Sequence, residues 1–157
     1  MKNEPEMLNA LANYCSQAER CLYDIRKKIQ AENFSEDAEK RITGRLLQEK
    51  FIDEKRFSRS FVHDKFKLNH WGRIKIAYEL KMKNIKPDDY YEAIETIGED
   101  EYLTVLTDLL AKKKRTVKGN SPQDTYQKLC RFAVSRGFEM PIIIKVLQKL
   151  LKNRLDD

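Results

Sequence analysis

The residues best suited to chemistry are crowded into the stretch FIDEKRFSRSFVHDKF at positions 51–66. Asp53, Glu54 and His63 supply two carboxyl groups and an imidazole, the groups that general acid–base catalysis uses. Adjacent residues of a helix diverge by about 100°, so these two carboxylates would not converge on one substrate. Asp53 is better explained as the cap of a helix, with Glu54 in its first turn. We therefore predict no catalytic residues.

A metal or cofactor site is not indicated either. His63 and His70 lie seven residues apart, but residues 69–72 favour a helix end between them, and no third ligand is evident. The three cysteines are Cys15, Cys21 and Cys130. They form no CxxC pair and are odd in number, a pattern typical of buried thiols. No glycine belongs to a phosphate-binding loop. We expect no metal, no cofactor and no enzyme activity.

The remaining chemistry is binding by basic residues. The net charge is +6, yet residues 111–157 hold 12 Lys/Arg and 4 Asp/Glu, so the positive charge is concentrated in the last third. Such asymmetry favours a polyanionic or acidic partner, although a charged helix face is often only solvated. The predicted binding residues are Arg73, Lys75, Lys81, Lys83, Lys112, Lys113, Lys114, Arg115, Lys118, Lys128, Arg131, Arg136, Lys145, Lys149 and Lys152.

Reading of DNA bases by a helix-turn-helix is less favoured. The recognition helix would fall on YYEAIETI or IIIKVLQKL, which are acidic and apolar respectively and therefore poor partners for a DNA groove. Contacts to phosphates need only flexible cations along a stripe, and they give salt-sensitive binding without sequence preference.

The elements that carry these residues are predicted to be helices. Gly and Pro, with 5 and 4 residues, are scarce, and apolar residues recur at helical spacing. The expected helices cover residues 8–32, 36–50, 53–67, 71–83, 87–97, 100–114, 122–136 and 140–153, with no strand. No apolar run reaches the roughly 18 residues that span a membrane, and the N-terminus lacks the features of a secretion signal, so we expect a cytoplasmic protein.

The helices form an internal repeat. Four sets of positions coincide: Ile25/Ile76/Leu129, Ile29/Leu80/Ala133, Asn33/Asn84/Gly137 and Phe34/Ile85/Phe138. The separations of the last set are 51 and 53 residues, which is typical of a modular array. In each copy Asn or Gly supplies a left-handed turn that ends one helix, and a second helix follows at once. We predict a flexible segment 1–12 and three-helix units at 13–67, 68–115 and 116–157.

The stretch 51–66 then becomes the third helix of the first unit. Ile52 and Phe57 flank the cap Asp53 as a hydrophobic staple, and Phe57, Phe61 and Phe66 recur on one helix face. The helix 99–115 is the counterpart in the second unit, and residues 115–124 form the linker to the third.

This order of residues resembles the RecX family, bacterial regulators of the RecA recombinase, over about residues 15–150. The residues that match the family pattern are Ile52, Asp53, Glu54, Phe57, Phe61, Val62, Gly72, Ile76, Leu80, Lys83, Asn84, Ile85, Gly137 and Phe138. Lys50 and Asn84 stand where the family usually has glycine, and Asn can adopt the same left-handed turn. Glu54 and Ser58 replace the commoner Asp and Ala.

The resemblance implies an elongated, curved, all-α array of tandem three-helix, helix-turn-helix-like repeats that lies in the groove of a RecA filament. It implies a non-enzymatic inhibitor of filament extension, strand exchange and ATP hydrolysis, acting in homologous recombination, DNA repair and the SOS response. We expect a monomer with a RecA filament as partner, weak non-specific contact with single- or double-stranded DNA, and no membrane. The alternative is a helical, non-sequence-specific DNA- or RNA-binding protein without a recombinase partner.

Overall fold

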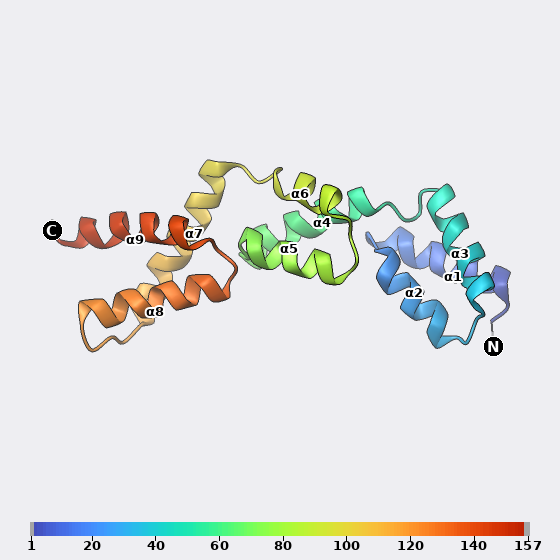
Figure 1. Cartoon of the computed structure of the whole chain (residues 1–157), viewed down its shortest axis with the longest axis horizontal. Helices are drawn as coiled ribbons and strands as arrows, with labels where there is room; N and C mark the ends of the chain where they lie inside the picture. The colour runs from blue at the N-terminus through green and yellow to red at the C-terminus, as the bar shows by residue number, and fades with distance from the viewer. Residues whose placement is uncertain (1, 156–157) are drawn as a thin grey trace. The chain divides into compact units, whose positions relative to one another are not determined.

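The computed structural model describes the backbone of residues 2–155 and the side chains up to Leu151. Within these residues the fold is all-α, as predicted, and holds no strand. Its helices are α1 (Glu4–Gln17), α2 (Leu22–Ala31), α3 (Glu36–Gln48), α4 (Glu54–Lys67), α5 (Arg73–Met82), α6 (Pro87–Ile94), α7 (Glu99–Thr116), α8 (Pro122–Ser135) and α9 (Met140–Leu155) (Figure 1). No helix in this part of the chain is long and apolar enough to cross a membrane.

The prediction of one continuous helix over residues 8–32 is wrong, because the structure divides this stretch into α1 and α2. Ala18 and Cys21 have extended backbones, and the Arg20 Nε donates to the Tyr14 carbonyl oxygen over 3.1 Å at the end of α1. Segment 1–12, predicted to be flexible, contains the first turns of α1. Asn3 and Glu6 form a capping box at the start of α1, and Met7 and Leu11 are buried.

The turns of the repeat have the predicted left-handed conformation. The φ angles are +62° at Asn33, +59° at Asn84 and +94° at Gly137. Each turn ends one helix and lets the next begin within a few residues, so α2–α3, α5–α6 and α8–α9 form three tight helix pairs. Lys50, at +61°, adopts the same conformation after α3.

The chain divides into two compact bodies. The first comprises Met1–Phe61 with Leu80–Tyr90, and the second comprises Val62–Glu79 with Tyr91–Asp157. In the first body α3 packs against both α1 and α2, and the core includes Leu11, Ile25 and Leu46. Burial of these apolar side chains stabilises helices that are too short to be stable alone.

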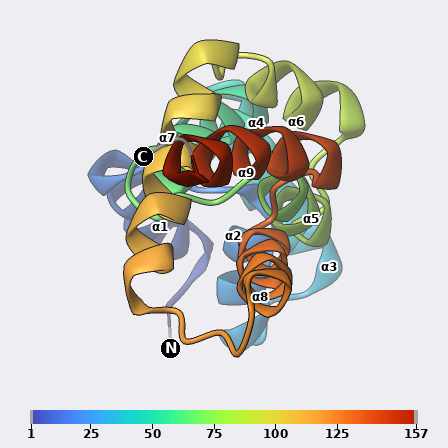
Figure 2. The same cartoon turned by 90° about the vertical axis from the view of Figure 1, so that its left-hand side faces the viewer.

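In the second body α7, α8 and α9 pack pairwise (Figure 2). An aromatic cluster fills part of its core, with ring centroids 5.8 Å apart for Phe66 and Tyr102 and 5.1 Å apart for Tyr102 and Phe138. The repeat analysis placed α7 at the end of the second unit, whereas its packing partners are α8 and α9. The packing therefore groups α7 with α8 and α9.

Candidate functional site

The basic run predicted at 112–115 forms the last turns of α7. Lys112 and Arg115 are exposed, and Lys113 and Lys114 are partly buried. The carbonyl groups at a helix C-terminus carry partial negative charge, so cations there are stabilised by about 0.3–1 kcal/mol. The helix thus concentrates positive charge at one end of the α7–α9 bundle.

Two hollows on this bundle carry the predicted cations. A hollow of about 770 Å³ is lined by Lys114, Arg115 and Lys118 together with apolar Leu150. A second, of about 260 Å³, lies against α7 and α9 and is lined by Lys145 and Lys149, again with Leu150. Because Leu150 lines both hollows, the five cations belong to one surface. We call these five residues and the two hollows the basic groove surface.

The cations on and near α8 have partners within the bundle. The Lys128 Nζ donates to the Lys118 carbonyl oxygen over 2.7 Å and lies 3.3 Å from a carboxylate oxygen of Asp124. Lys113 and Arg136 approach the Phe132 ring, with their charged atoms 4.8 and 5.1 Å from its centroid. These contacts hold the cations in defined positions. Arg131, also on α8, is exposed.

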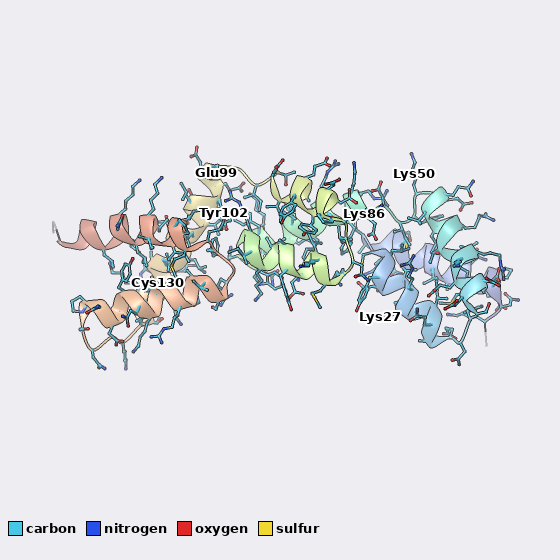
Figure 3. The ribbon with its side chains drawn as sticks, viewed as in Figure 1. Lys27, Lys50, Lys86, Glu99, Tyr102 and Cys130 are labelled. Carbon is cyan, nitrogen blue, oxygen red and sulfur yellow. The ribbon has the colours of Figure 1, made fainter. Side chains whose placement is uncertain are left out.

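Arg73 belongs to a charged cluster of the second body in which Arg73 and Glu139 are partly buried and Glu99 is exposed. Its guanidinium donates to Glu99 over 2.8 Å and to Glu139 over 3.0 Å, and it lies 3.9 Å from the centroid of the Tyr102 ring. The Tyr102 hydroxyl donates to Glu139 and accepts from the Arg73 amide over 3.0 Å. Burial, and then the hydrogen bond to Glu139, raise the pKa of Tyr102. Figure 3 places Glu99 and Tyr102 at the start of α7.

This cluster joins the start of α5 to α7 and α9, because Arg73 opens α5, Tyr102 lies on α7 and Glu139 directly precedes α9. Glu139 was not singled out in the sequence analysis as a partner of Tyr102. Tyrosine in a buried stripe needs a partner for its hydroxyl, so Tyr102 itself was the available signal.

The other predicted cations fall at separate places. Lys75 lies over the Trp71 ring, 4.4 Å from its centroid, and Lys83 forms a 3.0 Å ion pair with Asp24. Lys81 is exposed. The side chain of Lys152 lies outside the part of the chain whose side chains the structure describes.

The residues of the family pattern are mostly structural in their positions. Ile52, Phe57, Val62, Ile76, Leu80, Ile85 and Phe138 are buried, and Phe61 is partly buried. Asp53 caps α4 as predicted, because its Oδ1 accepts from the Arg56 amide over 3.0 Å. This hydrogen bond is the main cause that lowers the pKa of Asp53. All three cysteines are buried thiols, also as predicted.

Gly72 and Gly137 bring two backbones together in the second body. The Gly72 amide donates to the Arg136 carbonyl oxygen over 2.7 Å, and the Ile74 amide donates to that of Gly137 over 3.0 Å. A Cβ atom at Gly72 would lie 2.4 Å from the carbonyl carbon of Gly137. Only glycine fits this contact between the start of α5 and the turn before α9.

No group of three or more metal-ligating side chains occurs among the described residues. The arrangement as a whole is that of an all-α protein built from three-helix modules, with a basic, grooved surface on the last module. Proteins of this class act through binding to other macromolecules.

The comparison with known families identifies the chain more closely. Two models of one family match it: the second three-helix domain of RecX over residues 53–94 and the third over 99–147. The chain therefore belongs to the RecX family, as the sequence motifs predicted. The first range contains α4–α6, and the second contains α7, α8 and the first half of α9. The repeat analysis grouped α4 and α7 with the helices before them.

Relatives and solved structures agree with this assignment. The Regulatory protein RecX of Prosthecochloris aestuarii is 29% identical over 93% of this chain and 94% of its own length. Those of Clostridium tetani and Clostridium botulinum are 30% and 31% identical, and the chain spans 60% and 63% of their length. The crystal structure of RecX from Lactobacillus salivarius matches with a TM-score of 0.83 at 21% identity, covering 94% of this chain and 96% of that one. A second RecX crystal structure matches with a TM-score of 0.84 at 19% identity over 92% and 71%.

Proposed function

We propose that this protein modulates RecA recombinase filaments, and that it inhibits them by occupying the filament groove. The observation that carries the proposal is membership of a family whose curated members are named regulatory proteins. Bound along the groove, the protein would limit filament extension, strand exchange and ATP hydrolysis. The proposal places it in the cytoplasm as a monomer.

The basic groove surface supplies a contact suited to this role. Lys114, Arg115 and Lys118 line one hollow, and flexible cations around a hollow can follow acidic side chains or phosphates. A recombinase filament on DNA offers both kinds of anion. Phe57 and Phe66 of α4 would not take part, because both side chains are buried.

The second candidate is a helical protein that binds DNA or RNA without a recombinase. It is favoured by the same basic groove surface, which needs only phosphates as partner. The two candidates differ in their effect on RecA activity: the first inhibits RecA itself, whereas the second lowers its activity only by covering DNA.

The test measures RecA ATP hydrolysis and strand exchange on single-stranded DNA with increasing amounts of this protein. The proposal expects both activities to fall. If neither ATP hydrolysis nor strand exchange changes at an excess of the protein, the proposal of a recombinase regulator is refuted. If both fall only in proportion to the DNA that the protein covers, the second candidate is supported.

A charge-reversal variant tests the surface itself. Lys114→Glu/Arg115→Glu/Lys118→Glu should weaken inhibition by at least about tenfold and flatten its dependence on salt. The matched control is Lys2→Glu/Lys40→Glu/Lys50→Glu, which reverses three exposed charges of the first body and changes the net charge equally. Equal weakening by both variants would mean that only the total charge matters. Unchanged inhibition by the first variant would show that Lys114, Arg115 and Lys118 do not contact RecA or DNA.

A further inference from the structure

A second basic surface lies on α2, in the acidic part of the sequence where none was predicted. Tyr23, Arg26, Lys27 and Gln30 are spaced at i, i+3, i+4 and i+7, which places them on one face of the helix. Arg26, Lys27 and Gln30 are exposed, and Tyr23 is partly buried. Figure 3 shows Lys27 on this helix.

This face forms one wall of a hollow within the first body. The hollow has a volume of about 250 Å³ and is lined by Arg26, Lys27 and Gln30 of α2 and, opposite them, by Lys83 and Asn84. Lys83 and Asn84 form the left-handed turn after α5. The turn that ends α5 thus brings Lys83 and a second amide to the hollow.

The cations of the hollow are held in place by neighbours. The Lys27 Nζ lies 4.3 Å from the centroid of the Tyr23 ring, a cation–π contact. The Lys83 Nζ pairs with the Asp24 Oδ2 over 3.0 Å, and the same oxygen accepts from the Cys21 thiol over 3.2 Å. Side chains that are already ordered lose less entropy when an anion binds.

The acidic neighbours do not cancel this charge at the surface of the hollow. Asp24 is neutralised by Lys83. Glu54 also lines the hollow, but its Oε2 is buried from solvent and has no hydrogen-bond partner among the described residues. Burial raises the pKa of Glu54. Arg26 and Lys27, which are exposed, therefore supply the net positive charge that a ligand would meet.

We propose that this hollow binds the phosphodiester backbone of single-stranded DNA. Cations provide the charge that phosphates need, and the amides of Gln30 and Asn84 and the Tyr23 hydroxyl can donate to phosphate and sugar oxygens. A hollow of about 250 Å³ admits one phosphate with its sugar. The inference goes beyond the proposed function, because it requires neither RecA nor the basic groove surface.

The experiment measures binding of the full chain to fluorescent oligo(dT) by anisotropy at several salt concentrations, without RecA. Arg26→Glu/Lys27→Glu should weaken binding by about tenfold and lower the slope of log Kd against log salt by about 1.4, since each lost contact to a single strand removes about 0.7. Arg26→Gln/Lys27→Gln should show a smaller change in the same direction. Circular dichroism of each variant reports whether α2 stays folded.

The control is Lys28→Glu/Lys40→Glu, which reverses two exposed charges of the same body outside the hollow. Lys28 is the next residue on α2, but it faces Tyr14, 4.4 Å from that ring's centroid. The proposal is supported if this control binds oligo(dT) within about twofold of the parent. It is overturned if test and control variants weaken binding equally, or if oligo(dT) binding does not change. Loss of RecA inhibition with unchanged oligo(dT) binding would also overturn it, in favour of an acidic protein surface as the occupant.

Discussion

Gly72→Ala is expected to open the contact between the start of α5 and the turn that precedes α9. The new Cβ would lie 2.4 Å from both the carbonyl carbon and oxygen of Gly137 and 2.5 Å from the Phe138 nitrogen. All three are backbone atoms, so no side-chain rotation relieves the overlap. The two backbones must separate by about 1 Å to restore an ordinary van der Waals distance.

The cost follows from what this separation breaks. The hydrogen bonds from the Gly72 amide to Arg136 and from the Ile74 amide to Gly137, now 2.7 and 3.0 Å long, would both be stretched. Each contributes about 1 kcal/mol net, and the lost packing around the contact adds a similar amount. We therefore expect the free energy of unfolding of the second body to fall by about 3 kcal/mol.

Gly44→Ala is the matched control. Gly44 lies in the exposed part of α3, and a Cβ there would meet no atom within 4 Å. Alanine in a helix interior should stabilise it by about 0.5–1 kcal/mol relative to glycine. The same chemical change is thus expected to have opposite signs at the two sites.

The assay is urea unfolding followed by two probes. Trp71 is the only tryptophan and precedes Gly72 directly, so its fluorescence reports on this contact, while circular dichroism reports on all helices. A modular chain need not unfold in one step, and comparison of the two probes reveals whether it does. A Gly72→Ala midpoint in Trp71 fluorescence within error of the parent would refute the reasoning. So would a loss of stability in Gly44→Ala of similar size.

Two further predictions concern the first body. Lys50→Gly should raise the free energy of unfolding by about 0.5–1 kcal/mol. Lys50 is held at a φ of +61°, a conformation that costs a residue with a Cβ about 1–2 kcal/mol and costs glycine less. A Tm equal to or below that of the parent would contradict this prediction. Burial, the largest cause, raises the pKa of Glu54 above its ordinary 4.5, with Asp89 and Asp24 adding to the effect and Arg26 and a hydrogen bond from the Leu22 amide opposing it. The folded state therefore holds this proton more tightly than the unfolded state, and stability is lost as pH rises from about 4.5 through the folded pKa. Glu54→Gln should remove that loss, so its Tm relative to the parent should rise between pH 4.5 and 7.5, and parallel curves would show that Glu54 does not titrate abnormally.

Much of the local structure could be predicted from sequence because its causes are local. The left-handed turns at Asn33, Asn84 and Gly137 follow from residue types that tolerate positive φ, placed after a helical apolar stripe. The cap at Asp53 follows from one side chain and the first turn of α4. The end of α1 was missed because residues 18–21 contain neither Gly nor Pro. The apolar spacing gave no signal either, because Cys15, Leu22, Ile25 and Ile29 are separated by 7, 3 and 4 residues, as on one continuous helical stripe.

The length of the repeat could be predicted from the sequence, but the helix at which each unit begins could not. Equivalent positions recur every 51 and 53 residues wherever one chooses to begin a unit. Which helices pack together depends on long-range contacts, and here α7 packs against α8 and α9. The family models give the same grouping over residues 99–147.

The binding residues are the hardest to predict from the sequence, because the role of a cation depends on partners that are distant in sequence. Arg73 looked like a surface cation, yet its partners Glu99 and Glu139 lie 26 and 66 residues away. Arg26 and Lys27 gave no signal, since they lie in a region whose net charge is slightly negative. Only the fold brings Lys83 and Asn84 opposite them, in the hollow of the first body. Net charge along a sequence therefore locates the basic groove surface, whose cations are close in sequence, but misses a site built from two short segments almost 60 residues apart.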